Sequence, residues 1–263
     1  MGIFSKKIRL PIVGVQGAGK TYFFLCLGYL VSLKGLGEVS GVSHVYFSKL
    51  LEYVLRNEPI PATEKDVPIR IEIRIPKSIK GGTKRIVITS RDISGKEFET
   101  AMRLYAEDPI HAFNNKSVRK FIDLYRKVDG LLVVIDIVRD KKSYEEFVKD
   151  KDKNIRRAFA EQVLPLARVV ETAIEHKQVK GKPIFFIFTK SDIHRCSLDE
   201  LNEYLRRILA MTLVRLRNRG AIIKVHATSA IGWGMDAREE QLRKLGERGF
   251  LNVLSDIIGT FVR

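Results

Sequence analysis

One stretch near the start of the sequence constrains this chain more than any other. Residues 14–21 read Gly-Val-Gln-Gly-Ala-Gly-Lys-Thr, which is Gly, four residues, then Gly-Lys-Thr. An apolar segment of strand character, residues 8–13, precedes it, and an apolar helix-like run, residues 22–33, follows it. A glycine-rich loop between a strand and a helix is the context of a phosphate-binding loop. The stretch therefore predicts a nucleoside triphosphate site. It does not indicate which base is bound or what the energy of the nucleotide is used for.

Each residue type in this loop has a physical role in binding phosphate. The glycines let successive backbone N–H groups point into one concave nest, and the following helix adds its positive N-terminal end. Lys20 reaches the terminal phosphates as a point charge, and the Thr21 hydroxyl is a ligand for Mg²⁺. The residues expected to line the phosphates are Gly14, Gln16, Gly17, Ala18, Gly19, Lys20, Thr21 and Tyr22.

At 263 residues the chain could form one large domain or two small ones, and because no linker, repeat or low-complexity tract is visible, we expect one domain over residues 1–263. The chain is 45% apolar, enough for a buried core, and its Cys26 and Cys196 lie far apart without metal-ligand spacing. No cleavable leader is visible, and the apolar run 23–31 is shorter than the roughly 20 residues of a membrane span. We therefore expect a cytoplasmic protein.

The net charge of +16 permits an anionic partner, whether RNA, DNA or a membrane surface to which the protein would bind peripherally. The arginines that motivate this idea are Arg206, Arg207, Arg215, Arg217 and Arg219. Acidic residues are interleaved with basic ones along the chain, so a solvated, charge-rich surface is the simpler interpretation. Homo-oligomers are compatible with the sequence.

The order of elements predicts an α/β fold with a mostly parallel sheet and helices on both faces. Continuous apolar runs at 131–135 and 184–188 are typical of parallel strands buried on both sides. Residues 69–75 instead alternate Ile with charged residues, which favours a half-solvated antiparallel edge strand forming a hairpin with 85–90. Gly35 and Gly37 are predicted to end the first helix, and extra helices are expected at 43–56 and 117–127. A long helical region, 155–176, is predicted to be interrupted near Pro165.

Two aspartates follow predicted strands and compete for the role of Mg²⁺ carboxylate. Asp92 has Gly95 three residues on, and a glycine there lets its N–H approach a γ-phosphate. Asp136 has no such partner, so we favour Asp92 and assign Asp136 a structural or supporting role.

Polar residues after the last two predicted strands favour guanine. Asp192, in Thr189-Lys190-Ser191-Asp192, can accept two hydrogen bonds from the guanine N1–H and N2–H₂ edge, and the Lys190 stem can lie along the purine face. After the last strand, the Ala230 N–H can donate to guanine O6. Ligands of open α/β sheets bind at the carboxyl ends of strands, where both segments are predicted to lie. The base-binding set is Thr189, Lys190, Asp192, Ser229, Ala230 and Ile231.

With these segments in this order, the sequence resembles the Ras-like and translation-factor class of P-loop GTPases. The insert-bearing layout, with Thr189 where Asn is commoner, looks most like the prokaryotic branch sometimes called double-GTPases. The resemblance implies a six-stranded sheet with one antiparallel strand, helices inserted near both switch regions, and binding of GTP or GDP with Mg²⁺. It also implies a switch threonine that ligates Mg²⁺ and senses the γ-phosphate, for which Thr63 fits. Together with Thr21 and Asp92, Thr63 would complete the metal site.

Two positions depart from the family pattern. Lys96 follows Gly95 where many members carry a water-orienting Gln or His, so intrinsic hydrolysis is expected to be slow unless Glu97, Gln16 or a partner orients the water. Gln16 replaces a common Gly and would point toward the γ-phosphate, where it either helps catalysis or blocks an incoming arginine. The expected catalytic set is Lys20, Thr63, Gly95 and Gln16.

The sequence therefore favours a guanine-nucleotide switch whose loops around Thr63 and Lys96 signal to an unknown protein effector or activating partner. A P-loop ATPase or kinase is the first alternative, in which Asp192 has no role. A scaffold protein with a vestigial nucleotide site is the second, and Lys96 is its best support.

Overall fold

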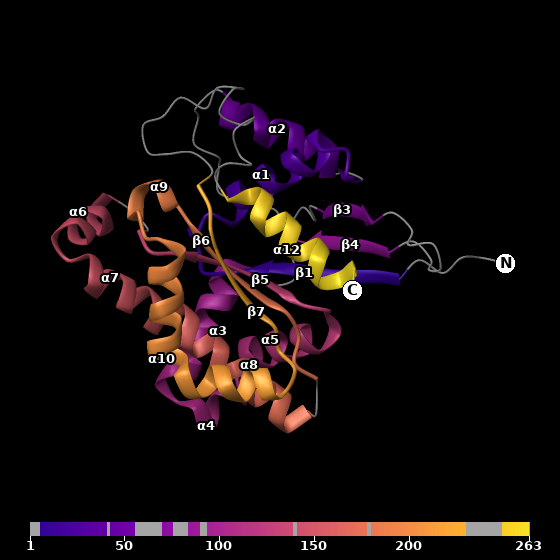
Figure 1. Cartoon of the computed structure of the whole chain (residues 1–263). Coiled ribbons are helices and arrows are strands. Elements are labelled where there is room, and N and C mark those ends of the chain that lie inside the picture. Colours follow the sequence, from indigo (N-terminus) through magenta and orange to yellow (C-terminus); the bar gives the residue numbers. More distant parts are fainter. Residues whose placement is uncertain are drawn as a thin grey trace.

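The computed structural model describes residues 6–40, 43–55, 70–75, 84–89, 94–138, 141–177, 180–229 and 249–262. They form an α/β fold around one sheet, which within the described ranges has seven strands in the order β2-β3-β4-β1-β5-β6-β7 (Figure 1). The pairs from β4 to β7 are parallel, and β2–β3 and β3–β4 are antiparallel. The strands are β1 (Lys6–Val13), β2 (Gly37–Val39), β3 (Arg70–Ile75), β4 (Lys84–Thr89), β5 (Leu131–Asp136), β6 (Ile184–Thr189) and β7 (Ile223–Ala227).

The mostly parallel sheet and the β3–β4 hairpin confirm the predicted class, but the strand count and the edge position were wrong. The additional strand, β2, has three residues and pairs antiparallel with β3, so β3 lies inside the sheet. A strand this short shows no alternation that a sequence pattern could reveal. Gly37, expected to end the first helix, begins β2 instead, and a Cβ there would lie 1.9 Å from the Glu72 carbonyl oxygen. Close strand pairing is therefore the reason for glycine at this position.

Helices cover both faces of the sheet, as predicted (Figure 1). One face carries α1 (Lys20–Leu33) and α12 (Phe250–Val262), with α2 (Ser43–Leu55) beside α1. The other face carries α3 (Gly95–Glu107), α5 (Lys116–Lys127), α8 (Leu164–Lys177) and α10 (Leu198–Asn218). The shorter helices are α4 (Pro109–Ala112), α6 (Lys141–Lys149), α7 (Lys151–Ala158) and α9 (Ser191–His194). None of the helices in the described ranges is both long and apolar enough to cross a membrane.

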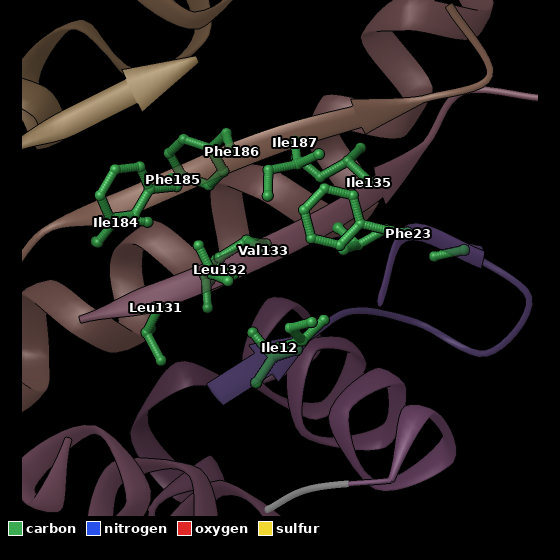
Figure 2. Close-up of a cluster of buried hydrophobic side chains, with 14 of the residues drawn as sticks. Ile12, Phe23, Leu131, Leu132, Val133, Ile135, Ile184, Phe185, Phe186 and Ile187 are labelled. Atoms are coloured by element: carbon green, nitrogen blue, oxygen red, sulfur yellow. The ribbon is translucent and has the colours of Figure 1, made fainter. Parts of the chain in front are cut away.

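The two central strands β5 and β6 are buried along their whole length, which confirms the expectation from their continuous apolar runs. Figure 2 shows their side chains in one cluster with Ile12 of β1 and Phe23 of α1. Phe23 also stacks on Phe250 of α12, with ring centroids 5.5 Å apart. This apolar layer fixes the ends of β1, β5 and β6 relative to one another, and the candidate site lies at those ends.

Pro11 lies inside the central strand β1, a place where proline normally removes a ladder hydrogen bond. The register explains why it is tolerated. Pairing with β4 ends at Pro11, and pairing with β5 begins at Ile12. Pro11 thus stands where the strand changes its partner.

The predicted break near Pro165 is a π-helical turn, η1 (Phe159–Val163), between α7 and α8. The Leu164 N–H bonds the Phe159 carbonyl, five residues back. Proline has no N–H for the usual helical bond to Glu161, so the widened turn before it leaves fewer backbone groups unsatisfied. The turn also redirects Gln162 into the core, where it is buried.

Candidate nucleotide-binding site

The carboxyl ends of five strands meet at one edge of the sheet. Chain order reverses there at β1, whose neighbours are β4 and β5. Such a switch point is where open α/β sheets bind ligands. The predicted phosphate loop leaves β1 at this edge, and the predicted base-binding segments leave β6 and β7 at the same edge.

The loop between β1 and α1 has the backbone conformation that only glycine adopts easily. Gly17 and Gly19 have φ of 79° and 83°, in the left-handed region. Gly14 has a φ of 155°, which L side chains also rarely adopt, and in addition a Cβ there would lie 2.4 Å from the Val134 carbonyl oxygen of β5. Gly17 lies at an exposed tip together with Gln16. The loop thus curves tightly over the end of β5 with its tip in solvent.

Lys20, the first residue of α1, folds back over this loop. Its ammonium donates to the carbonyl oxygens of Gly14 at 2.9 Å and Val15 at 2.7 Å. Burial lowers the pKa of Lys20 from its ordinary 10.5 to about 8, and the nearby Glu99 carboxylate opposes that shift. A desolvated cation at a helix N-terminus is the electrostatic arrangement that a phosphate would complete.

Gly95 brings the N-terminus of α3 against the phosphate loop. A Cβ at Gly95 would lie 2.7 Å from the Lys20 ammonium and 2.9 Å from the Gln16 backbone nitrogen. Only glycine allows this approach. Gln16, Lys20 and Gly95, which were all predicted for the site, therefore lie together. Glu99, which the sequence analysis did not single out, follows on the next turn of α3.

Glu97 is engaged in holding the start of α3. The Ser94 hydroxyl accepts from the Glu97 N–H, and the Glu97 carboxylate accepts from the Ser94 N–H, a reciprocal capping box. Lys120 of α5 also donates to Glu97 at 2.8 Å. These bonds lower the pKa of Glu97. Its carboxylate is therefore a poor candidate for orienting water. The neighbouring Lys96 is exposed.

Thr189, the last residue of β6, connects the predicted base-binding segment to the predicted phosphate loop. Its buried hydroxyl lies 3.0 Å from the Ala18 carbonyl oxygen and 3.2 Å from that of Ile135, so its one proton donates to either. Ala18 belongs to the phosphate loop and Ile135 to β5. This hydroxyl is therefore a direct link between the two halves.

The segments after β6 and β7 are joined by backbone bonds. The Ser191 N–H donates to the Thr228 carbonyl at 3.0 Å, and the Thr228 N–H donates to the Phe188 carbonyl at 2.8 Å. Ser229, at the end of the same segment, is buried. Asp192 lies in the short helix α9, directly after this junction.

Several predicted site residues lie outside what the structure describes. They are Thr63, Asp92, Ala230, Ile231 and the side chain of Asp192. Thr21, the remaining predicted Mg²⁺ ligand, lies half-buried in the first turn of α1 beside Lys20. No group of three or more His, Cys, Asp or Glu side chains arranged to hold a metal ion occurs among the described residues.

Sequence reasoning gave Asp136 only a general supporting role and overlooked Gln162. The structure places the Asp136 carboxylate 2.6 Å from the Lys190 ammonium, while Gln162 bonds the Asp136 backbone. Asp136 stands at the end of a buried strand, a signal that could have drawn attention to it. No local signal marks Gln162, since its position depends on the π-helical turn.

The arginines of α10 lie on its exposed side, and two of them pair with acids. Arg207 pairs with Glu203, and Arg215 donates to Glu171 of α8 at 2.9 Å. Such pairs reduce the positive potential of this face.

Comparison with known proteins gives structural neighbours only. No family model and no curated protein matches the chain. Among solved structures it is similar to translation elongation factor SelB from Methanococcus maripaludis in complex with the GTP analogue GppNHp, with 14% identity and a TM-score of 0.41. It is also similar to a mutant variant of SsGBP, with 14% identity and a TM-score of 0.33. Both alignments cover 98% of this chain but only 34% and 55% of those chains, respectively.

Proposed function

We propose that this chain is a guanine-nucleotide-binding switch that binds GDP and GTP with Mg²⁺ and hydrolyses GTP slowly. The observation that carries the proposal is the Thr189 hydroxyl. It links a glycine cradle with a desolvated lysine to the segment that begins Thr189-Lys190-Ser191-Asp192. A candidate phosphate-binding half and a candidate base-binding half therefore share one edge of the sheet.

On this proposal the phosphates lie in the nest of N–H groups between Gly14 and Lys20, with the Lys20 ammonium on the terminal phosphates. The tight packing of Gly14 and Gly95 supports the fit, because a Cβ at either position would fill the space that the loop needs. Lys20 would exchange its bonds to its own loop carbonyls for bonds to phosphate oxygens, which are stronger acceptors.

Mg²⁺ would be held by the Thr21 hydroxyl together with Thr63 and Asp92, a set of oxygen donors that suits a hard cation. When bound, it would neutralise charge on the phosphates. The base would be held by Asp192, the stem of Lys190 and the backbone N–H groups of the segment from Ser229 to Ile231.

Slow hydrolysis is expected because the described residues offer few groups to orient a water. Glu97 is bound to Ser94 and Lys120, and Lys96 carries a positive charge where an acceptor is needed. Among the described residues, Gln16 remains a candidate, since it is exposed at the tip of the loop. A protein partner can supply the missing group in trans, as positioning is most of what phosphoryl transfer requires.

The test is equilibrium binding of GDP, a GTP analogue and ADP to the purified chain with Mg²⁺. We expect a preference for guanine of at least about 100-fold, because guanine is the base whose polar edge matches both the Asp192 carboxylate and the Ala230 N–H. Asp192→Ala should abolish that preference. Asp199→Ala, a neighbouring exposed acid in the first turn of α10, is the matched control. A preference for ADP would support the ATPase or kinase alternative and contradict the proposal.

Hydrolysis is tested separately by single-turnover phosphate release from GTP, expected at below about 10⁻² s⁻¹ without a partner. GTP binding with no phosphate release above the uncatalysed background would support the scaffold alternative.

A further inference from the structure

Asp136 is a buried acid whose carboxylate contacts Lys190, in the segment that follows β6. Its side chain is fully buried, and its Oδ2 lies 2.6 Å from the Lys190 ammonium. Its Oδ1 accepts from the Val138 N–H at 2.9 Å, and the Lys190 ammonium also donates to the Val138 carbonyl at 2.7 Å. The carboxylate thus joins the turn after β5 to the turn after β6.

The backbone of Asp136 is held as closely as its side chain. Gln162 donates from its amide nitrogen to the Asp136 carbonyl at 3.0 Å, and its amide oxygen accepts from the Asp136 N–H at 3.4 Å. Gln162 reaches this position from the π-helical turn η1, a kind of distortion often found at functional sites. The buried amide of Gln162 therefore holds Asp136 in place, and Asp136 in turn holds Lys190.

Lys190 adopts a backbone conformation that needs such support. Its φ of 59° and ψ of 41° lie in the left-handed region, which is unfavourable for a residue with a Cβ. This conformation turns the chain from β6 into α9, the helix that contains Asp192. Because its ammonium is bound to Asp136 and Val138, Lys190 offers its methylene stem, rather than its charge, to a ligand.

We propose that Asp136, supported by Gln162, is a positioning residue that sets the affinity of the site for the guanine base. It acts through Lys190, holding the stem against the purine face and the left-handed turn in the geometry that presents Asp192. The inference rests on the proposed guanine-nucleotide function. It assigns a role within that site to two residues outside the predicted binding set.

The test measures GDP and ADP affinity and the GDP release rate for the full chain and for Asp136→Asn, Lys190→Met and the double variant. We expect Asp136→Asn to weaken GDP binding at least tenfold through faster release, with a smaller loss for ADP, which shares the purine face but not the contacts to Asp192. The double variant should bind GDP no more weakly than Lys190→Met, because both changes remove the same interaction. Glu171→Gln is the matched control, since Glu171 is also a buried acid paired with a cation, Arg215, and should stay within twofold of wild type.

Gln162→Met keeps the length of the side chain but removes its amide, and is expected to weaken GDP binding about threefold. It replaces Asp136→Asn as the deciding variant if the latter does not fold. Wild-type affinity in the folded deciding variant would overturn the inference while leaving the proposed function intact, and so would losses that multiply in the double variant. A wild-type chain that binds no guanine nucleotide would overturn the proposed function itself.

Discussion

The two halves of the candidate site are built by different means. The phosphate half is a contiguous loop, Gly14 to Lys20, held by glycine backbone and by Lys20 bonded to its own loop. The base half is assembled from side chains far apart in sequence, with Asp136 and Lys190 separated by 54 positions. Local backbone geometry thus determines the first half, and buried polar contacts between strands determine the second. Mutations in the two halves should therefore differ in their effects on stability and on nucleotide binding.

The largest effect is expected from Gly14→Ala, which should lower the free energy of unfolding by about 3 kcal/mol. The new Cβ would lie 2.4 Å from the Val134 carbonyl oxygen, a contact with backbone that no side-chain rotation relieves. Urea-induced unfolding measures the change.

Gly17→Ala is the matched control in the same loop. A Cβ there has no described atom within 4 Å, so only the left-handed φ of 79° is unfavourable, at about 1 kcal/mol. Equal destabilisation by the two substitutions would show that the loop is not packed against β5 as described.

Lys20→Met should weaken GDP binding at least about 100-fold, or about 2.7 kcal/mol. The methylene stem is kept, but the phosphates lose their cation. The stability of the nucleotide-free protein should change little, because the substitution removes a buried charge but also the Lys20 bonds to the Gly14 and Val15 carbonyls. Calorimetric titration with GDP measures the affinity, and Lys34→Met at the exposed end of α1 is the control. GDP affinity within tenfold of wild type would remove Lys20 from the phosphate site.

The same contrast explains what the sequence could predict. The candidate phosphate loop was predicted from eight consecutive residues, because phosphate binding requires glycine and lysine at fixed local spacing. The buried strands β5 and β6 were located from their apolar runs. The strand β2 was missed, since three residues carry no periodicity. Gln162 was missed because its position depends on a π-helical turn that no short motif encodes.

Thr189→Val tests the connection between the halves and should have a smaller effect. Valine has nearly the same shape but cannot donate to Ala18 or Ile135, so about 1 kcal/mol of stability and about fivefold in GDP affinity should be lost. Thr189→Ser keeps the hydroxyl and should stay closer to wild type in the GDP release rate. A serine variant as impaired as the valine variant would show that the methyl group, not the hydroxyl, matters here.

The last expected effect is a pH dependence that only the phosphate half should show. Since burial lowers the folded-state pKa of Lys20 to about 8, the folded chain releases this proton at a lower pH than the unfolded chain. The unfolded state then binds more protons between about pH 8 and pH 10.5, so Lys20 makes nucleotide-free stability rise across that window, by at most about 3 kcal/mol.

GDP affinity should change in the opposite direction, because only the protonated ammonium attracts phosphate. Between pH 7 and pH 9 the fraction of nucleotide-free chains with a charged Lys20 falls about tenfold, and the affinity should fall by up to the same factor. Lys20→Met is the control, since titration of the nucleotide itself affects both proteins equally. An identical pH profile in the two proteins would mean that the Lys20 ammonium does not meet the phosphates, and the division between a charged half and a base-reading half would then be wrong.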